Sequence, residues 1–121
     1  MRLTRMQIRS GASRHVLLIC EWAIKIPRLT SWRSFLWGLL ANDQERMFSR
    51  FKGMSGLCPI VAACPLGFWV VMRRARPLSQ SEFAEFDYDE FVRQSQTFDL
   101  VEFKRCSFGW VGNEIVAVDY G

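Results

Sequence analysis

The sequence predicts an α+β fold: a small antiparallel sheet with one main packed helix, a second, acidic helical segment and a C-terminal β-hairpin. Three observations lead to this prediction. Short β-rich runs lie near both ends of the chain, one long stretch has apolar residues at helical spacing, and a later acidic stretch has phenylalanines at near-helical spacing. Because half of the 121 residues are hydrophobic, the chain can build one core, and we expect a single domain over 1–121.

The first predicted elements are strands. Residues 3–9 alternate weakly between apolar and polar side chains and lead into a turn. Residues 15–20 and 22–27 are β-rich runs separated by Glu21 alone, which fits either a tight hairpin or one bent strand. Pro27 ends the second run because proline has no N–H to donate.

The main helix is predicted next. Thr30 or Ser31 can cap its start, because a hydroxyl oxygen accepts a hydrogen bond from a free N–H of the first turn. Asn42-Asp43 can bend or divide the helix. Its apolar positions recur at three and four residues: Trp32, Phe35, Leu36, Leu39 and Leu40, with Met47, Phe48 and Phe51 further on.

Residues 53–72 contain no charge, and twenty uncharged positions are long enough to cross a membrane. Three glycines and two prolines divide the stretch, and Pro59 and Pro65 would interrupt helical hydrogen bonds. We therefore expect two buried strands, over 57–63 and 68–72, and no membrane span.

The C-terminal part predicts helices followed by strands. Residues 81–96 are acidic and favour one or two short helices. Residues 100–103, 108–111 and 114–118 are strand-like, and Gly112-Asn113 between the last two is typical of a hairpin turn.

The charges divide the chain into a basic and an acidic part. Residues 1–76 hold 13 Arg or Lys against 3 acids, whereas residues 77–121 hold 3 against 9. A basic surface attracts phosphate, nucleic acid or an acidic protein, but it is also typical of a solvated arginine-rich face. We expect a protein partner, with nucleotide and nucleic acid as further candidates.

The cysteines favour free thiols in a reducing cytoplasm. Cys20, Cys58, Cys64 and Cys106 form no C-x-x-C pair and His15 is the one histidine, so we expect no zinc site. The first ten residues lack the apolar stretch of a secretory signal. We expect a cytoplasmic protein, in the host cytoplasm if it is phage-encoded.

Two charged residues lie within or directly after apolar strand-like runs. Lys25 lies within the run 22–27, and Asp119 directly follows the run 115–118. A nucleotide phosphate and its magnesium ion require such a pair, and a buried ion pair would look the same. Both interpretations are open at this point, as are a snorkelling Lys25 and a solvated Asp119.

The residues around these two charges form three short motifs. They are Ala23-Ile24-Lys25, Glu102-Phe103-Lys104-Arg105-Cys106-Ser107 and Asp119-Tyr120-Gly121. They resemble the lysine strand, the catalytic loop (D-x-K-x-x-N) and the metal-binding D-F-G of the protein-kinase-like fold. The chain as a whole resembles that fold pared down to its nucleotide-binding part, as in a small phage or bacterial kinase-like protein.

The resemblance implies ATP and Mg²⁺ as ligands and assigns roles to particular residues. The implied nucleotide-binding residues are Ala23, Lys25, Glu45, Met72, Arg73 and Ala75. The implied catalytic residues are Glu102 and Lys104, and the implied metal ligands are Asp119 and Ser107.

The chain departs from the family pattern at several of these points. Ser10-Gly11-Ala12-Ser13 is not a G-x-G-x-x-G loop, Glu102 replaces an aspartate and Ser107 replaces an asparagine. On an unbroken helix, Glu45 falls opposite the apolar face, so we expect it to reach Lys25 only if the helix is reset near Asn42. We also expect the activation segment and most of the C-terminal lobe to be absent.

These observations predict a kinase-like scaffold with a binding or regulatory role and weak or vestigial ATP and Mg²⁺ binding. One alternative is an active small ATP-dependent phosphotransferase. A second alternative is a basic interaction protein that inhibits a host nucleic-acid or defence machine without binding nucleotide.

Overall fold

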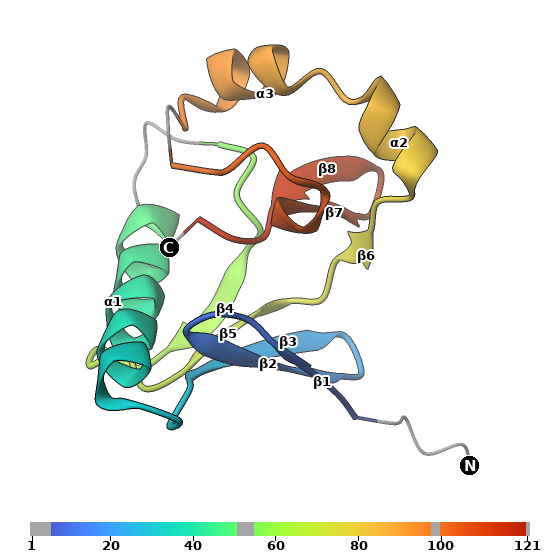
Figure 1. Cartoon of the computed structure of the whole chain (residues 1–121). Helices are drawn as coiled ribbons and strands as arrows, with labels where there is room; N and C mark the ends of the chain where they lie inside the picture. Colours follow the sequence, from blue (N-terminus) through green and yellow to red (C-terminus); the bar gives the residue numbers. More distant parts are fainter. Residues whose placement is uncertain (1–5, 51–54, 98–99, 121) are drawn as a thin grey trace.

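The computed structural model describes residues 6–50, 55–97 and 100–120. It has a five-stranded antiparallel sheet with a long helix beside it, and a three-stranded sheet with two short helices (Figure 1). The chain thus has the predicted α+β fold, with the main helix, the acidic helical segment and the C-terminal hairpin.

The five-stranded sheet has the order β1-β2-β3-β5-β4. Its strands are β1 (Gln7–Ser10), β2 (Arg14–Ile19), β3 (Trp22–Pro27), β4 (Ile60–Ala63) and β5 (Val70–Arg73). β2 and β3 pair in register from Ile19–Trp22 to Arg14–Pro27, so the first β-rich runs form a tight hairpin. Cys20 adopts a positive φ of 52° in its turn. Residues 3–5 of the first predicted run lie outside the described residues.

Helix α1 (Trp32–Ser49) is continuous, so the predicted bend at Asn42-Asp43 is wrong. Ser31 caps it by accepting a hydrogen bond from the Ser34 N–H at 3.1 Å. The Asn42 side chain does not break the helix because it donates hydrogen bonds to two carbonyl groups outside it, those of Lys25 and Gly67.

The orientation of α1 also differs from the prediction. Its fully buried residues are Gly38, Asn42 and Glu45, so a small and polar face packs on the sheet. An added Cβ at Gly38 would lie 2.5 Å from the Ser13 carbonyl oxygen and 2.7 Å from the Pro27 Cα, which explains why this position lacks a side chain. Many of the large apolar side chains that we expected to pack inward are exposed instead: Trp32, Leu36, Leu40 and Met47. Phe51 lies outside the described residues.

The uncharged middle of the chain forms the antiparallel strands β4 and β5, as predicted, although both are shorter than their predicted ranges. The expectation that both are buried is wrong for β4, which is the edge strand of the sheet and has no buried residue. Leu57 makes only an isolated bridge to Ala117. Within the described residues, no helix is long and apolar enough to cross a membrane.

The second sheet has the order β6-β7-β8. Its strands are β6 (Arg76–Pro77), β7 (Phe108–Val111) and β8 (Glu114–Ala117), and β7 and β8 form the predicted hairpin. The predicted strand 100–103 is wrong: this segment bends, and its Val101 carbonyl accepts a hydrogen bond from the Tyr88 hydroxyl at 2.6 Å. The Phe103 ring turns toward the rings of Phe83 and Tyr88.

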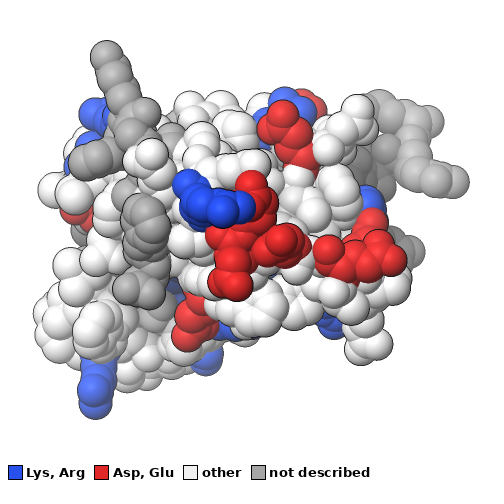
Figure 2. Space-filling view, turned by 90° about the horizontal axis from the view of Figure 1, so that it is seen from above, with Lys and Arg blue, Asp and Glu red and all other residues white. Residues whose placement is uncertain are grey.

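The acidic segment forms α2 (Gln80–Glu85) and α3 (Tyr88–Ser95) beside the second sheet. Their phenylalanines pack toward Phe108, with ring centroids of Phe86 and Phe91 at 4.7 and 5.3 Å from it. Acidic side chains gather on the outer face, which Figure 2 shows from above. The basic and acidic parts of the sequence thus belong largely to different sheets and their helices.

Candidate functional site

Four charged side chains from distant parts of the chain meet between the two sheets. They are Arg14, Lys25, Glu45 and Asp119, and we call them the ionic cluster. Glu45 lies at its centre: its carboxylate is 2.7 Å from an Arg14 nitrogen and 2.9 Å from the Lys25 Nζ. A second Arg14 nitrogen donates to Asp119 Oδ1 at 2.8 Å. Arg14 therefore bridges two carboxylates.

Strand pairing and the inward face of α1 position this cluster. Arg14 begins β2, Lys25 lies opposite Val16 in the β2–β3 pair, and Asp119 follows β8. Glu45 reaches Lys25 from a continuous helix, so our expectation that the helix must be reset was wrong. It rested on the assumption that the apolar face of α1 packs on the sheet, whereas the polar face does.

Three members of the cluster, Arg14, Lys25 and Glu45, are buried, and their hydrogen bonds are largely satisfied. Glu45 is 0% exposed and Lys25 is 4% exposed. The Tyr120 N–H donates to Glu45 Oε2 at 3.1 Å, and the Lys25 ammonium also donates to the Val118 carbonyl. Buried charges persist in proteins when they are paired in this way.

The environment shifts the pKa values within the cluster. Burial by itself raises the pKa of Glu45, but the positive charges of Lys25 and Arg14 outweigh burial and hold that pKa below its usual value. Burial likewise disfavours a charged Arg14, yet Glu45 and Asp119 raise the pKa of its guanidinium. Burial lowers the pKa of Lys25 below its usual value, and the negative charge of Glu45 only partly offsets this effect. Glu45 and Arg14 are consequently charged at neutral pH.

A cleft of about 680 Å³ opens beside the ionic cluster. Its lining includes Lys25, Arg14 and Asp119, so three of the four cluster members face it. Apolar side chains line the cleft as well: Val16, Leu18, Ala23, Met72, Leu78, Phe108 and Val118. The cleft thus offers an apolar surface for a flat ring together with cations for an anionic group.

The segment after β5 lies along this cleft, with Arg73, Arg74 and Ala75 in its lining. Met72 pairs with Ala23 in the sheet and is buried. The Arg73 carbonyl accepts a hydrogen bond from the Cys58 thiol at 3.1 Å. Among the described residues, by contrast, no hydrogen bond uses the N–H or C=O of Ala75, so both groups can serve a ligand.

Of the four residues expected to do catalysis or hold a metal, Lys104 and Asp119 line the cleft, whereas Glu102 and Ser107 do not. Glu102 is outside its lining, its side chain is 75% exposed, and its carboxylate pairs with Lys104 at 2.8 Å. Lys104 lines the cleft. Ser107 is buried and absent from the lining, and its hydroxyl has no hydrogen-bond partner among the described residues. Gly121 of the Asp119-Tyr120-Gly121 motif lies outside the described residues.

Sequence reasoning missed Arg14. Its signal was the alternation in β2, which places Arg14 on the same strand face as Val16 and Leu18, and all three line the cleft. The predicted strand-like run began one residue after Arg14, and the register that sets Arg14 beside Lys25 and Glu45 is a property of the folded hairpin.

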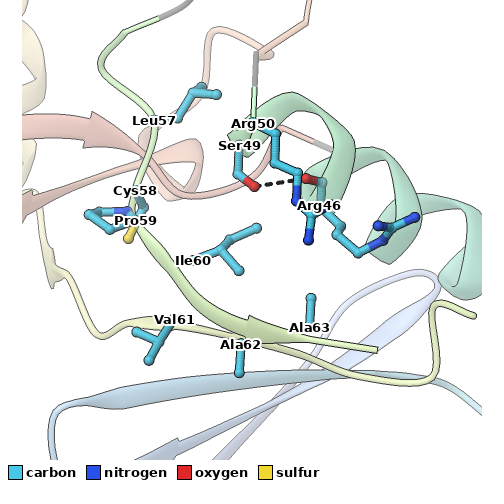
Figure 3. Close-up of a pocket in the computed structure, with 10 residues that line it drawn as sticks. All are labelled: Arg46, Ser49, Arg50, Leu57, Cys58, Pro59, Ile60, Val61, Ala62 and Ala63. Carbon is cyan, nitrogen blue, oxygen red and sulfur yellow. Dashed lines mark hydrogen bonds between the residues drawn. The ribbon is translucent and has the colours of Figure 1, made fainter. Parts of the chain in front are cut away.

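A second hollow, of about 380 Å³, lies between the last turn of α1 and the edge strand β4 (Figure 3). Arg46 and Arg50 line it on the helix side, and Ile60 and Ala63 line it on the strand side. None of the predicted site residues belongs to it. The ionic cluster and its cleft therefore form the candidate functional site.

Comparisons of the chain with protein-family models, with curated proteins and with solved structures found no match. The kinase-like resemblance accordingly rests only on the motifs of this sequence. A function has to be inferred from the geometry of that site.

Proposed function

We propose that this chain is a kinase-like nucleotide-binding protein that acts by binding or regulation and not by transferring phosphate. The observation that supports this proposal is the composition of the cleft. Apolar side chains on β2, β3, β5 and β7 lie within the same hollow as Arg14, Lys25 and Lys104. A nucleotide has both parts that such a hollow requires, a flat apolar base and an anionic phosphate chain.

The proposed nucleotide is ATP, with its base against Ala23 and Met72. The N–H and C=O groups of Ala75, which make no hydrogen bond within the described part of the chain, would hydrogen-bond the edge of the base. Lys25 and Arg14 would face the phosphates, since both side chains line the cleft. Arg73 contributes lining, but its carbonyl already accepts the Cys58 thiol.

Phosphoryl transfer is not favoured by this geometry. A catalytic base has to come within hydrogen-bond reach of the attacking group. Glu102 is outside the cleft, and its hydrogen bond with Lys104 holds the pKa of Glu102 below its usual value, which makes it a weaker base. The protein is therefore proposed to hold the nucleotide without consuming it, in the cytoplasm where ATP is abundant.

Isothermal titration calorimetry with ATP tests the nucleotide proposal directly, because it measures the heat of binding and not a change in protein stability. Ala23→Leu adds bulk where the base would lie and should weaken ATP binding at least tenfold. Ala84→Leu makes the same change on an exposed position of α2 and should leave binding unchanged. Equal affinity for ATP in both variants would contradict the proposed place of the base, and no binding to the wild type would refute the function.

The outward face of α1 favours a second candidate function, a protein-interaction role. Trp32, Trp37, Leu40 and Met47 are each more than half exposed on one helix, and contiguous exposed apolar surface is typical of an interface. Proteins retained from a lysate by the wild type should be lost with Leu40→Lys and kept with Ile8→Lys, which alters an equally exposed residue of β1. Retention by both variants would contradict this interface.

A further inference from the structure

Arg14 lies between the carboxylates of Glu45 and Asp119, and Asp119 is one of the two residues that the kinase-like resemblance assigns to the metal. Its guanidinium donates to both oxygens of Glu45, at 2.7 and 3.2 Å, and to Asp119 Oδ1 at 2.8 Å. Its side chain is nine-tenths buried, so these contacts are enclosed. The Arg14 Nη1 also donates a hydrogen bond to the Asn42 Oδ1 at 3.0 Å.

The remaining oxygen atoms do not suit a magnesium ion. Magnesium requires about six oxygen ligands at about 2.0–2.1 Å in octahedral geometry. Both Glu45 oxygens already accept hydrogen bonds from Arg14 and Lys25, and one of the Asp119 oxygens accepts from Arg14. Ser107, the other expected ligand, does not line the cleft. The described residues contain no group of three or more His, Cys, Asp or Glu side chains that could hold a metal.

The cleft already has the positive charge that a metal would bring. Its lining contains seven Arg or Lys side chains and one carboxylate, that of Asp119. The second carboxylate, Glu45, lies behind Arg14 and Lys25 and is matched by them. A triphosphate can therefore be neutralised by side chains alone, and a divalent cation beside Arg14 would be repelled by it.

We infer that the cleft binds the phosphate chain of a nucleotide as the metal-free anion, with the Arg14 guanidinium in place of a divalent cation. This inference rests on the proposed nucleotide-binding function. It assigns Arg14 the role of neutralising Asp119, which would otherwise repel the phosphates, while the other Arg and Lys side chains of the lining attract them.

The test is calorimetric titration with ATP in two buffers, one with excess EDTA and one with excess Mg²⁺. The wild type should bind ATP in EDTA at least as tightly as in Mg²⁺, because Mg²⁺ lowers the charge of the ligand that the cations attract. Arg14→Met exposes the Asp119 carboxylate, so its affinity in EDTA should fall at least tenfold, and Mg²⁺ should restore part of it. Arg33→Met, on the exposed face of α1 and outside the cleft, is the matched control and should behave like the wild type.

Asp119→Asn provides a second variant if Arg14→Met does not fold. Asp119 is 43% exposed, so its substitution leaves the buried Lys25–Glu45 pair intact. Removing the single carboxylate of the lining should leave metal-free binding unchanged or strengthen it, whereas loss of ATP binding in this variant would contradict the inference.

The outcomes separate the two proposals. Binding by the wild type that requires Mg²⁺ would overturn the metal-free inference and leave the nucleotide-binding function standing. Absence of binding in both buffers would overturn the nucleotide-binding function and the inference with it. Equal Mg²⁺ dependence in the wild type and Arg14→Met would show that Arg14 does not replace the cation.

Discussion

The substitution Glu45→Gln should destabilise this protein strongly. Glu45 is fully buried and accepts hydrogen bonds from Arg14, Lys25 and the Tyr120 N–H. Glutamine keeps the size of the side chain but removes one negative charge from a cluster of two cations and two carboxylates. Arg14 retains the charged partner Asp119, whereas Lys25 retains only uncharged acceptors, the Val118 carbonyl and the amide oxygen of the new glutamine. The variant thus leaves a buried ammonium without a counter-charge.

The expected loss follows from that unpaired charge. Removing one partner of a buried ion pair costs about 3–5 kcal/mol in the free energy of unfolding. For 121 residues, an unfolding entropy of about 2 cal/mol/K per residue converts this loss into a Tm lower by roughly 12–20 °C. Typical domains have only about 5–15 kcal/mol of stability in total, so this loss is a large fraction of the stability expected for the wild type.

Urea denaturation followed by tryptophan fluorescence measures this loss. Glu85→Gln makes the same change at an exposed site on α2 and should stay within about 0.5 kcal/mol of the wild type. The double variant Lys25→Met/Glu45→Gln should lose less than the sum of its two single variants, since neither charge is then left alone. Breaking a buried ion pair costs about 3–5 kcal/mol in the free energy of unfolding. A loss of less than about 1 kcal/mol for Glu45→Gln would therefore refute the ionic cluster as described.

Three further predictions concern pH, packing and thiol chemistry. Lys25 and Arg14 hold the pKa of Glu45 below its usual 4.5, so the stability from this carboxylate is present above pH 4.5 and is lost as the pH falls through the folded-state pKa. The free energy of unfolding, measured by urea denaturation at a series of acidic pH values, should therefore depend less on pH in the Glu45→Gln variant than in the wild type. Gly38→Ala places a Cβ against the Ser13 carbonyl and the Pro27 Cα. The variant should lower the free energy of unfolding by about 1–3 kcal/mol, although alanine has the better helix propensity. A stabilised variant would contradict the close packing of α1. Burial raises the pKa of the Cys58 thiol to about 11. At pH 8, a thiol reagent should therefore label the exposed Cys20 and Cys106 in the native protein and label Cys58 only after unfolding. Mass spectrometry of the labelled peptides checks this order.

Local patterns were sufficient to predict most of the secondary structure. The cap at Ser31, the hairpin turn at Gly112-Asn113 and the strand pair around Pro65 are set by a few neighbouring residues, and each lies where the sequence indicates. Helical spacing also predicted α1 correctly. The segment 100–103 was predicted wrongly because its apolar residues pack against rings from α2 and α3, and periodicity does not reveal such distant partners.

The sequence by itself determined the fold class and the elements that provide Lys25, Glu45 and Asp119. Only the tertiary structure decided which face of α1 packs on the sheet and that Arg14 joins these residues. The physical reason is that the cluster gains its stability from contacts between residues far apart, such as Arg14 and Asp119, which are 105 positions apart. The polar face of α1 packs inward because Asn42 and Glu45 find partners on other elements, and those partners exist only once the chain has folded.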